Sequence, residues 1–244
     1  MIAAPLYYQI ILETLASVWE SQQPSLETAA GWIADALASD RCLYLFGTGH
    51  SHLLSLELFY RAGGLAQAAP ILEESLMLHE SASGSSERER EEGFAARILQ
   101  RYPVAPGDVL LVASNSGRNA VPIEMTLEAK ARGLKTIALT SLTHSRSVLS
   151  RHTSGARLFE VADLSLDNGA VVGDASVTLP GTEACMGPTS TIIGSFLVNA
   201  LALEAATLAI QRGWTPAIYT SANGDGGDRN AELLCRFRDR LPHL

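Results

Sequence analysis

Two turns that are rich in glycine and hydroxyl residues each follow a short apolar run. The turn Ser114-Asn115-Ser116-Gly117-Arg118-Asn119 comes directly after the apolar run at 109–113. A short apolar run bounded by Gly and Ser is typical of a buried strand, and we predict a helix after it, over 120–132. The free backbone N–H groups of a helix start, together with the hydroxyls of Ser114 and Ser116, can bind an anion. The pattern therefore predicts a phosphate site.

The same arrangement occurs earlier in the chain, where Gly47-Thr48-Gly49-His50-Ser51 follows an apolar run at 42–46. One such turn is weak evidence, because any tight connection between a strand and a helix favours Gly and Ser. Two copies favour a ligand that lies across both turns. We assign phosphate binding to Gly47, Thr48, Gly49, Ser51, Ser114, Asn115, Ser116, Gly117 and Asn119, and other substrate contacts to His50 and Arg118.

The two turns resemble the phosphosugar-binding loops of the SIS (sugar isomerase) family, and the likeness extends over residues 30–212. In the second turn, Asn119 stands where the family usually has Thr. The run at 187–191 is similar to a third, hydroxyl-rich helix start of the family, which implies phosphate contacts from Thr189 and Ser190. Longer signatures at 59–64 and 167–170 indicate a subgroup, similar to the phosphoheptose isomerases. The resemblance implies a flavodoxin-like topology and no organic cofactor.

The composition is that of an ordinary globular α/β protein, with 47% hydrophobic and 18% charged residues among 244. A net charge of −8 argues against nucleic acid as the main partner. Three widely spaced cysteines lack zinc-ligand spacing and favour a reducing cytoplasm. We expect no signal peptide, because no basic segment opens the chain and Pro5 comes early, and no stretch long enough to span a membrane.

Apolar runs and helical patterns alternate along the middle of the chain. They predict strands at 42–46, 68–72, 109–113, 135–140 and 158–162, and helices near 51–62, 86–101 and 120–132. This alternation predicts a three-layer α/β/α fold around a mainly parallel, five-stranded sheet. We expect a capping box from Ser86 and Glu89, Pro122 in a first helical turn, and Gly133 at a helix end. The Ser-rich run at 81–85 is expected to be flexible, as part of a solvated face or of a lid.

The two ends flank the domain at 41–212. Residues 1–40 are predicted to form helices that break near Pro24, and their apolar stripe serves either core packing or contact with a second copy. Within the domain, 163–187 is Gly-rich and β-like, and 189–211 is a long apolar helix. Residues 213–244 are expected to pack on the same domain as a loop and a helix. Their run at 223–228 resembles a calcium loop but lacks its final Glu, so we predict a turn.

Aldose–ketose isomerisation moves a proton between adjacent carbons, which requires a carboxylate or an imidazole. The candidates are Glu57, on the helix after the first turn, and the adjacent His79 and Glu80, after the second strand. Each could equally be a surface residue. The isomerases and etherases of the SIS family use a Glu farther along the helix, near Arg61 of this chain, so their mechanism does not transfer directly.

His50 and His52 have a spacing that can bind a metal, but no third ligand follows them, and no metal is predicted. Asp167 and Asn168 could bind sugar hydroxyls or hold a turn. The sequence favours a cytoplasmic, homodimeric phosphosugar isomerase with no membrane partner. A sugar-phosphate etherase or lyase and a non-catalytic phosphosugar sensor are the alternatives. Dinucleotide chemistry is disfavoured, because neither turn contains Gly-x-Gly-x-x-Gly.

Overall fold

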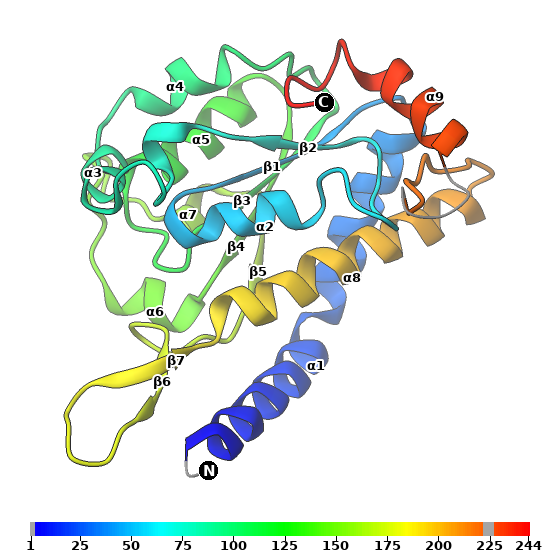
Figure 1. The fold of residues 1–244 in the computed structure, drawn as a ribbon. Helices are drawn as coiled ribbons and strands as arrows, with labels where there is room; N and C mark the ends of the chain where they lie inside the picture. The colour runs from blue at the N-terminus through cyan, green and yellow to red at the C-terminus, as the bar shows by residue number, and fades with distance from the viewer. Residues whose placement is uncertain (1–2, 222–226) are drawn as a thin grey trace.

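A five-stranded parallel sheet forms the centre of the molecule (Figure 1). The computed structural model describes residues 3–221 and 227–244. The strand order is β2-β1-β3-β4-β5, and every neighbouring pair is parallel. The strands are β1 (Leu43–Gly47), β2 (Ala68–Ile71), β3 (Val109–Ala113), β4 (Lys135–Thr140) and β5 (Leu164–Asp167). The predicted three-layer fold and its parallel sheet are confirmed.

Each face of the sheet has its own hydrophobic core, because successive side chains of a strand point to opposite faces. On one face Leu45 and Leu111 pack in the same core as α1 (Ala3–Ala38), α2 (His52–Glu57) and α8 (Ser190–Gln211). On the other face Phe46 and Val112 share a core with α4 (Phe94–Leu99), α5 (Ala120–Ala131), α7 (Leu158–Val161) and α9 (Gly227–Phe237). Burial of each large apolar side chain contributes about 2 kcal/mol, so the two cores hold the layers together.

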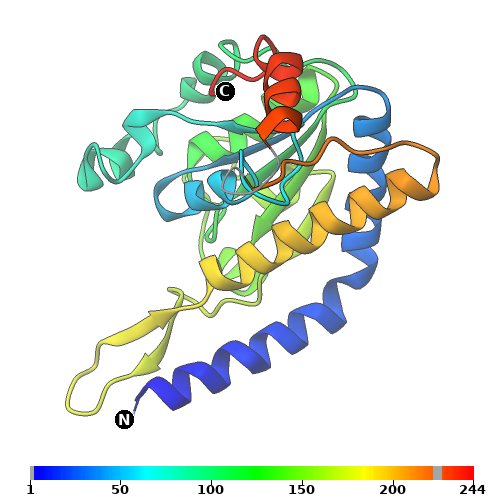
Figure 2. The same ribbon diagram turned by 45° about the vertical axis from the view of Figure 1, so that its right-hand side comes forward.

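The first helix, α1, is continuous over 36 residues, so the predicted break near Pro24 is wrong. Proline removes one helical hydrogen bond. The helix persists because Leu26, Ala30 and Ile33 are buried in the core that α1 shares with α8. The N-terminal half of α1 extends away from the sheet, beside the hairpin of β6 (Ala175–Thr178) and β7 (Cys185–Pro188) (Figures 1 and 2).

Two predicted elements are corrected. Residues 158–161 form the helix α7, and the last strand begins only at Leu164. The Glu160 carboxylate accepts hydrogen bonds from the backbone and guanidinium of Arg157, which stabilises this short helix start. The predicted helix at 86–101 is instead two short helices, α3 (Ala82–Arg88) and α4, separated at Gly93 with φ of 77°. Only a glycine adopts such a backbone conformation without strain.

The start of α3 also differs from the prediction. Ser81 caps the helix, since its hydroxyl accepts a hydrogen bond from the Gly84 N–H. The run at 81–85, predicted to be flexible, is therefore the cap and first turn of a helix. The Ser86 hydroxyl bonds the Ala82 carbonyl, so the predicted capping box with Glu89 is wrong. Glu89 is thus left free to contact other parts of the molecule.

Helix boundaries elsewhere follow the expected signals. Pro122 lies in the first turn of α5, and Gly133 follows its end with φ of 82°, as predicted. A short helix α6 (Leu142–Ser147) follows β4, and two 3₁₀ turns, η1 (Gly49–Ser51) and η2 (Glu74–Leu76), follow β1 and β2. The turn predicted at 223–228 lies largely outside the described residues.

The long helix α8 has the length and apolar composition of a membrane-spanning helix. The expectation that no stretch is long enough is therefore wrong. Half of this apolar stretch is buried inside the molecule. Core helices of soluble proteins meet the same two criteria, so length and composition alone are weak evidence for a membrane span.

Candidate functional site

The loops after β1 and β3 leave the sheet at the point where its strand order reverses. From β1 the chain passes to β2 on one side, whereas β3 lies on the other side of β1. Ligands of open parallel sheets bind at such a switch point, beyond the carboxyl ends of the strands. A cavity of about 300 Å³ lies here. It is lined by Thr48, Gly49, His50, Ser51, Leu78, Ser85, Ser86, Glu89, Ser114, Asn115, Ser116, Asn119 and His144.

The first loop depends on Gly47, the last residue of β1. A Cβ atom at this position would lie 2.4 Å from the backbone oxygen of Ser51. No such approach is possible for a side chain, so only glycine lets the chain turn back over the end of β1 into η1. The turn is closed by the Ser51 N–H, which donates to the Thr48 carbonyl at 3.0 Å. Gly49 has φ of 54°, but nothing would crowd a Cβ there within 3.8 Å.

Gly47→Ala is expected to destabilise the protein by about 1 kcal/mol more than Gly49→Ala. The first substitution forces backbone apart, and overpacking of this kind costs about 1–3 kcal/mol. The second adds only the strain of an alanine in a left-handed conformation, about 1 kcal/mol. Urea unfolding of both variants measures the difference. Equal losses of stability would contradict the close approach of Ser51 to Gly47.

The second loop is held rigidly by residues from neighbouring strands. Asn115 Oδ1 accepts a hydrogen bond from Asn168 Nδ2 at 3.0 Å, and its backbone oxygen accepts one from the Ser141 N–H at 3.1 Å. Gly117 has φ of 56° and lies so close to the Leu158 side chain that a Cβ would approach it to 3.0 Å. The loop is therefore set in shape without a ligand, as suits a preorganised anion site.

Glu89 is the carboxylate of this cavity, and it contacts both loops. Its Oε1 accepts a hydrogen bond from Thr48 Oγ1 at 2.7 Å, and its Oε2 accepts one from Asn119 Nδ2 at 2.8 Å. The Glu89 backbone oxygen accepts from the Val121 N–H at 3.1 Å, which fixes the residue to the start of α5. Asn119 is the N-cap residue of α5, but its side chain makes no capping bond and bonds Glu89 instead. A carboxylate so placed can accept a proton from a ligand held by the same two loops.

His144, on α6, is the second ionisable group that sequence reasoning missed. It lines the cavity, and its Nδ1 is buried without a hydrogen-bond partner among the described residues. Burial lowers the pKa of His144, and the nearby positive charge of Arg118 lowers it further, against an opposing effect of Asp174. A lowered pKa keeps the imidazole neutral near pH 7, so it can donate or accept a proton.

The third predicted phosphate contact is occupied by a carboxylate of the protein itself. Asp174 Oδ1 accepts hydrogen bonds from the backbone N–H groups of Thr189 and Ser190, at 3.0 and 2.9 Å. The Ser190 hydroxyl donates to Asp174 Oδ2. Asp174 has φ of 63°, which turns its side chain back onto the start of α8. Thr189 and Ser190 can bind a phosphate only where Asp174 is displaced.

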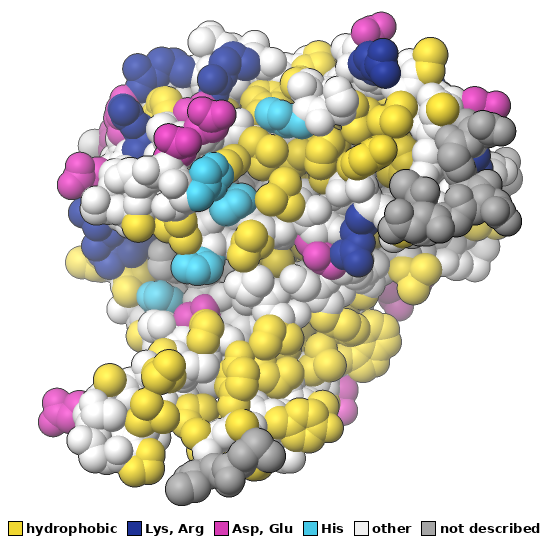
Figure 3. Space-filling model, in the orientation of Figure 1, with side chains coloured by type: hydrophobic (Ala, Val, Ile, Leu, Met, Phe, Trp, Pro, Cys, Tyr) yellow, Lys and Arg dark blue, Asp and Glu magenta, His cyan; other side chains and the backbone are white. Residues whose placement is uncertain are grey.

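None of the three residues proposed as catalytic from the sequence is among the residues that line the cavity, although His79 follows the lining residue Leu78. Glu57 forms an ion pair with Arg61 and accepts a hydrogen bond from Asn199 Nδ2 at 2.7 Å. His79 and Glu80 are exposed. His50 lines the cavity, whereas His52 is buried and bonds the Gly49 carbonyl. Figure 3 shows several histidine side chains close together on this face of the molecule.

The remaining polar candidates hold the loops. Asp167 Oδ1 accepts from the N–H groups of Leu142 and Gly169, and Asn168 Oδ1 accepts from the Ala170 N–H. Both side chains therefore brace turns at the sheet edge. Asn168 also lines a small cavity next to the first, shared with His50 and Ser114, so it can still contact a ligand.

The comparisons with known proteins agree with this fold. Residues 6–141 match the SIS domain, and the chain belongs to the SIS domain family. A UPF0309 protein from Geobacillus thermodenitrificans is 43% identical over 239 residues, which cover 98% of this chain and 96% of the relative. The phosphoheptose isomerase of Neisseria gonorrhoeae has the same fold, with a TM-score of 0.52 and 16% identity over 85% of this chain and 96% of that one. The phosphoheptose isomerase of Francisella tularensis gives a TM-score of 0.53 and 16% identity, over 83% and 96%.

Proposed function

We propose that this protein binds a sugar phosphate across the loops after β1 and β3 and isomerises it between aldose and ketose forms. The observation that carries the proposal is Glu89, whose carboxylate lies between two hydroxyl-lined loops and contacts both. Membership of the SIS domain family and the phosphoheptose isomerases of the same fold support a phosphosugar as the ligand. The phosphate is held by the hydroxyls of Ser114 and Ser116 and by backbone N–H groups of the second loop, which leads into α5.

In this proposal Glu89 transfers the proton. With the phosphate fixed at the second loop, Glu89 takes a proton from the carbon next to the carbonyl and returns it to the former carbonyl carbon. Over the same step the carbonyl oxygen gains a proton and the neighbouring hydroxyl oxygen loses one. The sugar is isomerised, and no atom is gained or lost overall. His144 and His50 line the cavity, and they transfer the protons to and from the sugar oxygen atoms. Glu57, His79 and Glu80 are the alternative groups for this chemistry, and each lies outside the lining residues named above.

Two other activities use the same site. A sugar-phosphate etherase or lyase would begin with the same proton abstraction and then expel a substituent. A sensor would bind the phosphosugar and leave its C–H bonds intact. We also propose that the isomerase is cytoplasmic and that it uses neither an organic cofactor nor a metal.

The test combines binding with proton exchange. A thermal-shift screen against pentose, hexose, heptose and amino-sugar phosphates identifies ligands, because a ligand at 100 times its Kd stabilises the native state by about 2.7 kcal/mol. The best ligands are then incubated with the protein in D₂O and followed by NMR. We expect deuterium at the carbon next to the carbonyl, together with the isomer. Exchange with loss of a substituent would indicate a lyase, and binding without exchange would indicate a sensor.

A homodimer is the assembly that we propose, formed through α1 and α8. An apolar groove of about 690 Å³ lies between these helices, and Leu26, Phe196 and Ala200 line it. At its edges Trp19 is 47% exposed and Leu203 is 71% exposed. Exposed apolar surface of this extent is unusual for a monomer. A second copy is the partner we favour, because closed two-fold dimers are the commonest soluble assemblies.

Light scattering is expected to give twice the 26.0 kDa of one chain. Leu203→Glu should shift the protein toward the monomer, because it places a charge in the proposed apolar contact. Leu127→Glu is the matched control, since Leu127 is exposed on α5, on the other face of the sheet. A wild-type protein that stays monomeric at micromolar concentration would refute the dimer.

A further inference from the structure

Three arginines, Arg90, Arg118 and Arg151, lie close enough to one another and to Glu89 for their charges to interact. Arg90 follows Glu89 in the chain, and Arg118 precedes Asn119. Arg151 comes from the loop after α6, and its Nη1 donates a hydrogen bond to Asn119 Oδ1 at 3.1 Å. The backbone of this loop also meets the second phosphate loop, because the Arg151 N–H donates to the Arg118 carbonyl at 2.8 Å. None of the three arginines lines the cavity itself, but Arg151 contacts Asn119, which does.

These arginines have no carboxylate partner at ion-pair distance within residues 3–221 and 227–244, although the chain has an excess of acidic residues. Nine arginines elsewhere are paired, such as Arg101 with Glu73 and Arg212 with Asp35, whereas Arg41, Arg146 and Arg238 also lack a carboxylate at ion-pair distance in the described residues. The Nε atom of Arg118 is buried and has no hydrogen-bond partner in the described part of the chain. A buried, unsatisfied guanidinium nitrogen is costly, which points to an acceptor that arrives with a ligand.

The positive charges also act on one another. Burial lowers the pKa of Arg151, and the charges of Arg118 and Arg90 lower it further, while Glu89 alone opposes them. Like charges at short range repel, and an anion between them removes the repulsion. Lys and Arg side chains gather at one edge of the face that carries the histidines (Figure 3).

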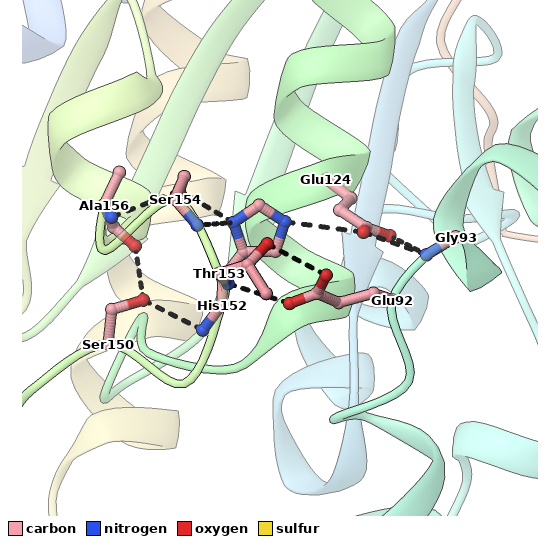
Figure 4. Close-up of polar contacts among 8 residues, drawn as sticks. All are labelled: Glu92, Gly93, Glu124, Ser150, His152, Thr153, Ser154 and Ala156. Atoms are coloured by element: carbon pink, nitrogen blue, oxygen red, sulfur yellow. Dashed lines mark hydrogen bonds and ion pairs between the residues drawn. The ribbon is translucent and has the colours of Figure 1, made fainter.

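The loop that carries Arg151 is anchored by the two residues that follow it (Figure 4). Glu92 accepts hydrogen bonds from the N–H and the hydroxyl of Thr153, at 2.8 and 3.0 Å. His152 Nε2 lies 3.5 Å from Glu124 Oε1, and Glu124 in turn accepts from the Gly93 N–H. Arg151 is therefore held in place without a ligand, which lowers the entropic cost of binding one.

The same cluster has donor atoms that could hold a metal ion, since those of Glu92, Glu124 and His152 lie within 4.8 Å of one another. The hydrogen bonds favour a structural role instead. The Ser154 N–H donates to His152 Nδ1 at 3.2 Å, so in a neutral ring the proton is on Nε2, facing Glu124. Both carboxylates already accept hydrogen bonds from backbone N–H groups.

We propose that Arg118 and Arg151, with Arg90 at the rim, bind a second anionic group of the substrate, a phosphate or a carboxylate. The substrate class is then a sugar phosphate that carries two separate anionic groups. This inference rests on the proposed phosphosugar site. Guanidinium groups suit either anion, because their parallel N–H donors match two oxygens of a carboxylate or phosphate.

Matched ligand pairs test the proposal by calorimetry. Fructose 1,6-bisphosphate is compared with fructose 6-phosphate, and 6-phosphogluconate with glucose 6-phosphate, so that each pair differs mainly by one anionic group. The wild type is expected to bind the doubly anionic member of at least one pair roughly tenfold more tightly, the effect of one charged hydrogen bond. The pair that shows the preference identifies the second group as phosphate or carboxylate.

Arg151→Gln and Arg118→Gln should each abolish this preference and leave the affinity for the singly phosphorylated member within about twofold of the wild type, because the first phosphate is held elsewhere. Arg238→Gln is the control for net charge, since Arg238 is exposed near the C-terminus. Thermal unfolding without ligand checks that each variant is folded.

Three outcomes would overturn the inference. The first is equal affinity for both members of each pair. The second is a preference that survives in both arginine variants. The third is an equal loss of affinity for both members, which would place the arginines on the first phosphate. If no sugar phosphate binds at all, the proposed function fails and the inference fails with it, whereas binding without preference leaves the proposed function intact.

Discussion

Replacing Glu89 with Gln is expected to lower the turnover of the proposed isomerase reaction by about 10²- to 10⁴-fold, the usual contribution of general acid–base catalysis. The amide has nearly the shape of the carboxylate but cannot accept the proton. It keeps one oxygen acceptor for the Thr48 hydroxyl or the Asn119 amide, so the loops stay in place. The effect should therefore fall on the chemical step and not on the fold.

Ligand affinity should move in the opposite direction. Glu89 is an anion next to the proposed phosphate site, and it repels the phosphate. The neutral Gln removes this repulsion, so we expect binding of the sugar phosphate to become tighter while turnover falls. Such a split between binding and turnover separates a proton-transfer role from a structural one.

Glu87→Gln is the matched control, because Glu87 is exposed on the same helix, two residues before Glu89. It should change neither turnover nor affinity. Full turnover of Glu89→Gln on the true substrate would remove Glu89 from the mechanism. Glu57→Gln, Glu80→Gln and His79→Ala would then decide among the remaining groups.

The two loops of the candidate site could be predicted because their signals are local. A buried strand ends in small residues, and Gly47 and Gly117 occupy backbone positions that side chains do not tolerate. The order of the strands then brings the two loops together, because parallel strands end at the same edge of the sheet. Short-range chemistry and a general rule of topology are enough for this part of the site.

Glu89 and His144 could not be assigned in the same way. Glu89 reaches the cavity only because α3 ends early and the chain turns before α4, whereas the charged run around it suggests a solvated helix. His144 did leave a signal, since it follows the carboxyl end of β4 by a few residues. Applying the switch-point argument to every strand, and not only to the two with Gly-rich turns, would have identified it.

The wrong strand at 158–162 and the carboxylate found at 189–190 have a different cause. The run at 158–162 is short and apolar, a pattern that strands and buried helix turns share. The hydrogen bonds between Arg157 and Glu160 stabilise the helix. At the start of α8 the hydroxyl residues are present as expected. Asp174, which bonds these residues, is 15 residues away in sequence from Thr189. No local sequence pattern predicts that its side chain folds back onto the start of α8.

Combining Ser114→Ala with Ser116→Ala is expected to weaken sugar-phosphate binding by about a hundredfold. Each hydroxyl can donate one hydrogen bond to a phosphate oxygen, and bonds to charged groups contribute about 1.5–3 kcal/mol each. Stability should change little, because the Ser114 hydroxyl only accepts a long bond from the Gly117 N–H, at 3.3 Å. Calorimetry and thermal unfolding of the double variant give the two quantities.

Two single variants make this result specific to the second loop. Ser83→Ala removes an exposed hydroxyl from α3 and should leave binding unchanged. Ser190→Ala removes a hydroxyl that donates to Asp174, so it should weaken binding only if the ligand displaces that carboxylate. A double variant with wild-type affinity would place the phosphate elsewhere. If Ser190→Ala and the double variant each lose binding, the ligand displaces Asp174, and the start of α8 completes the anion site.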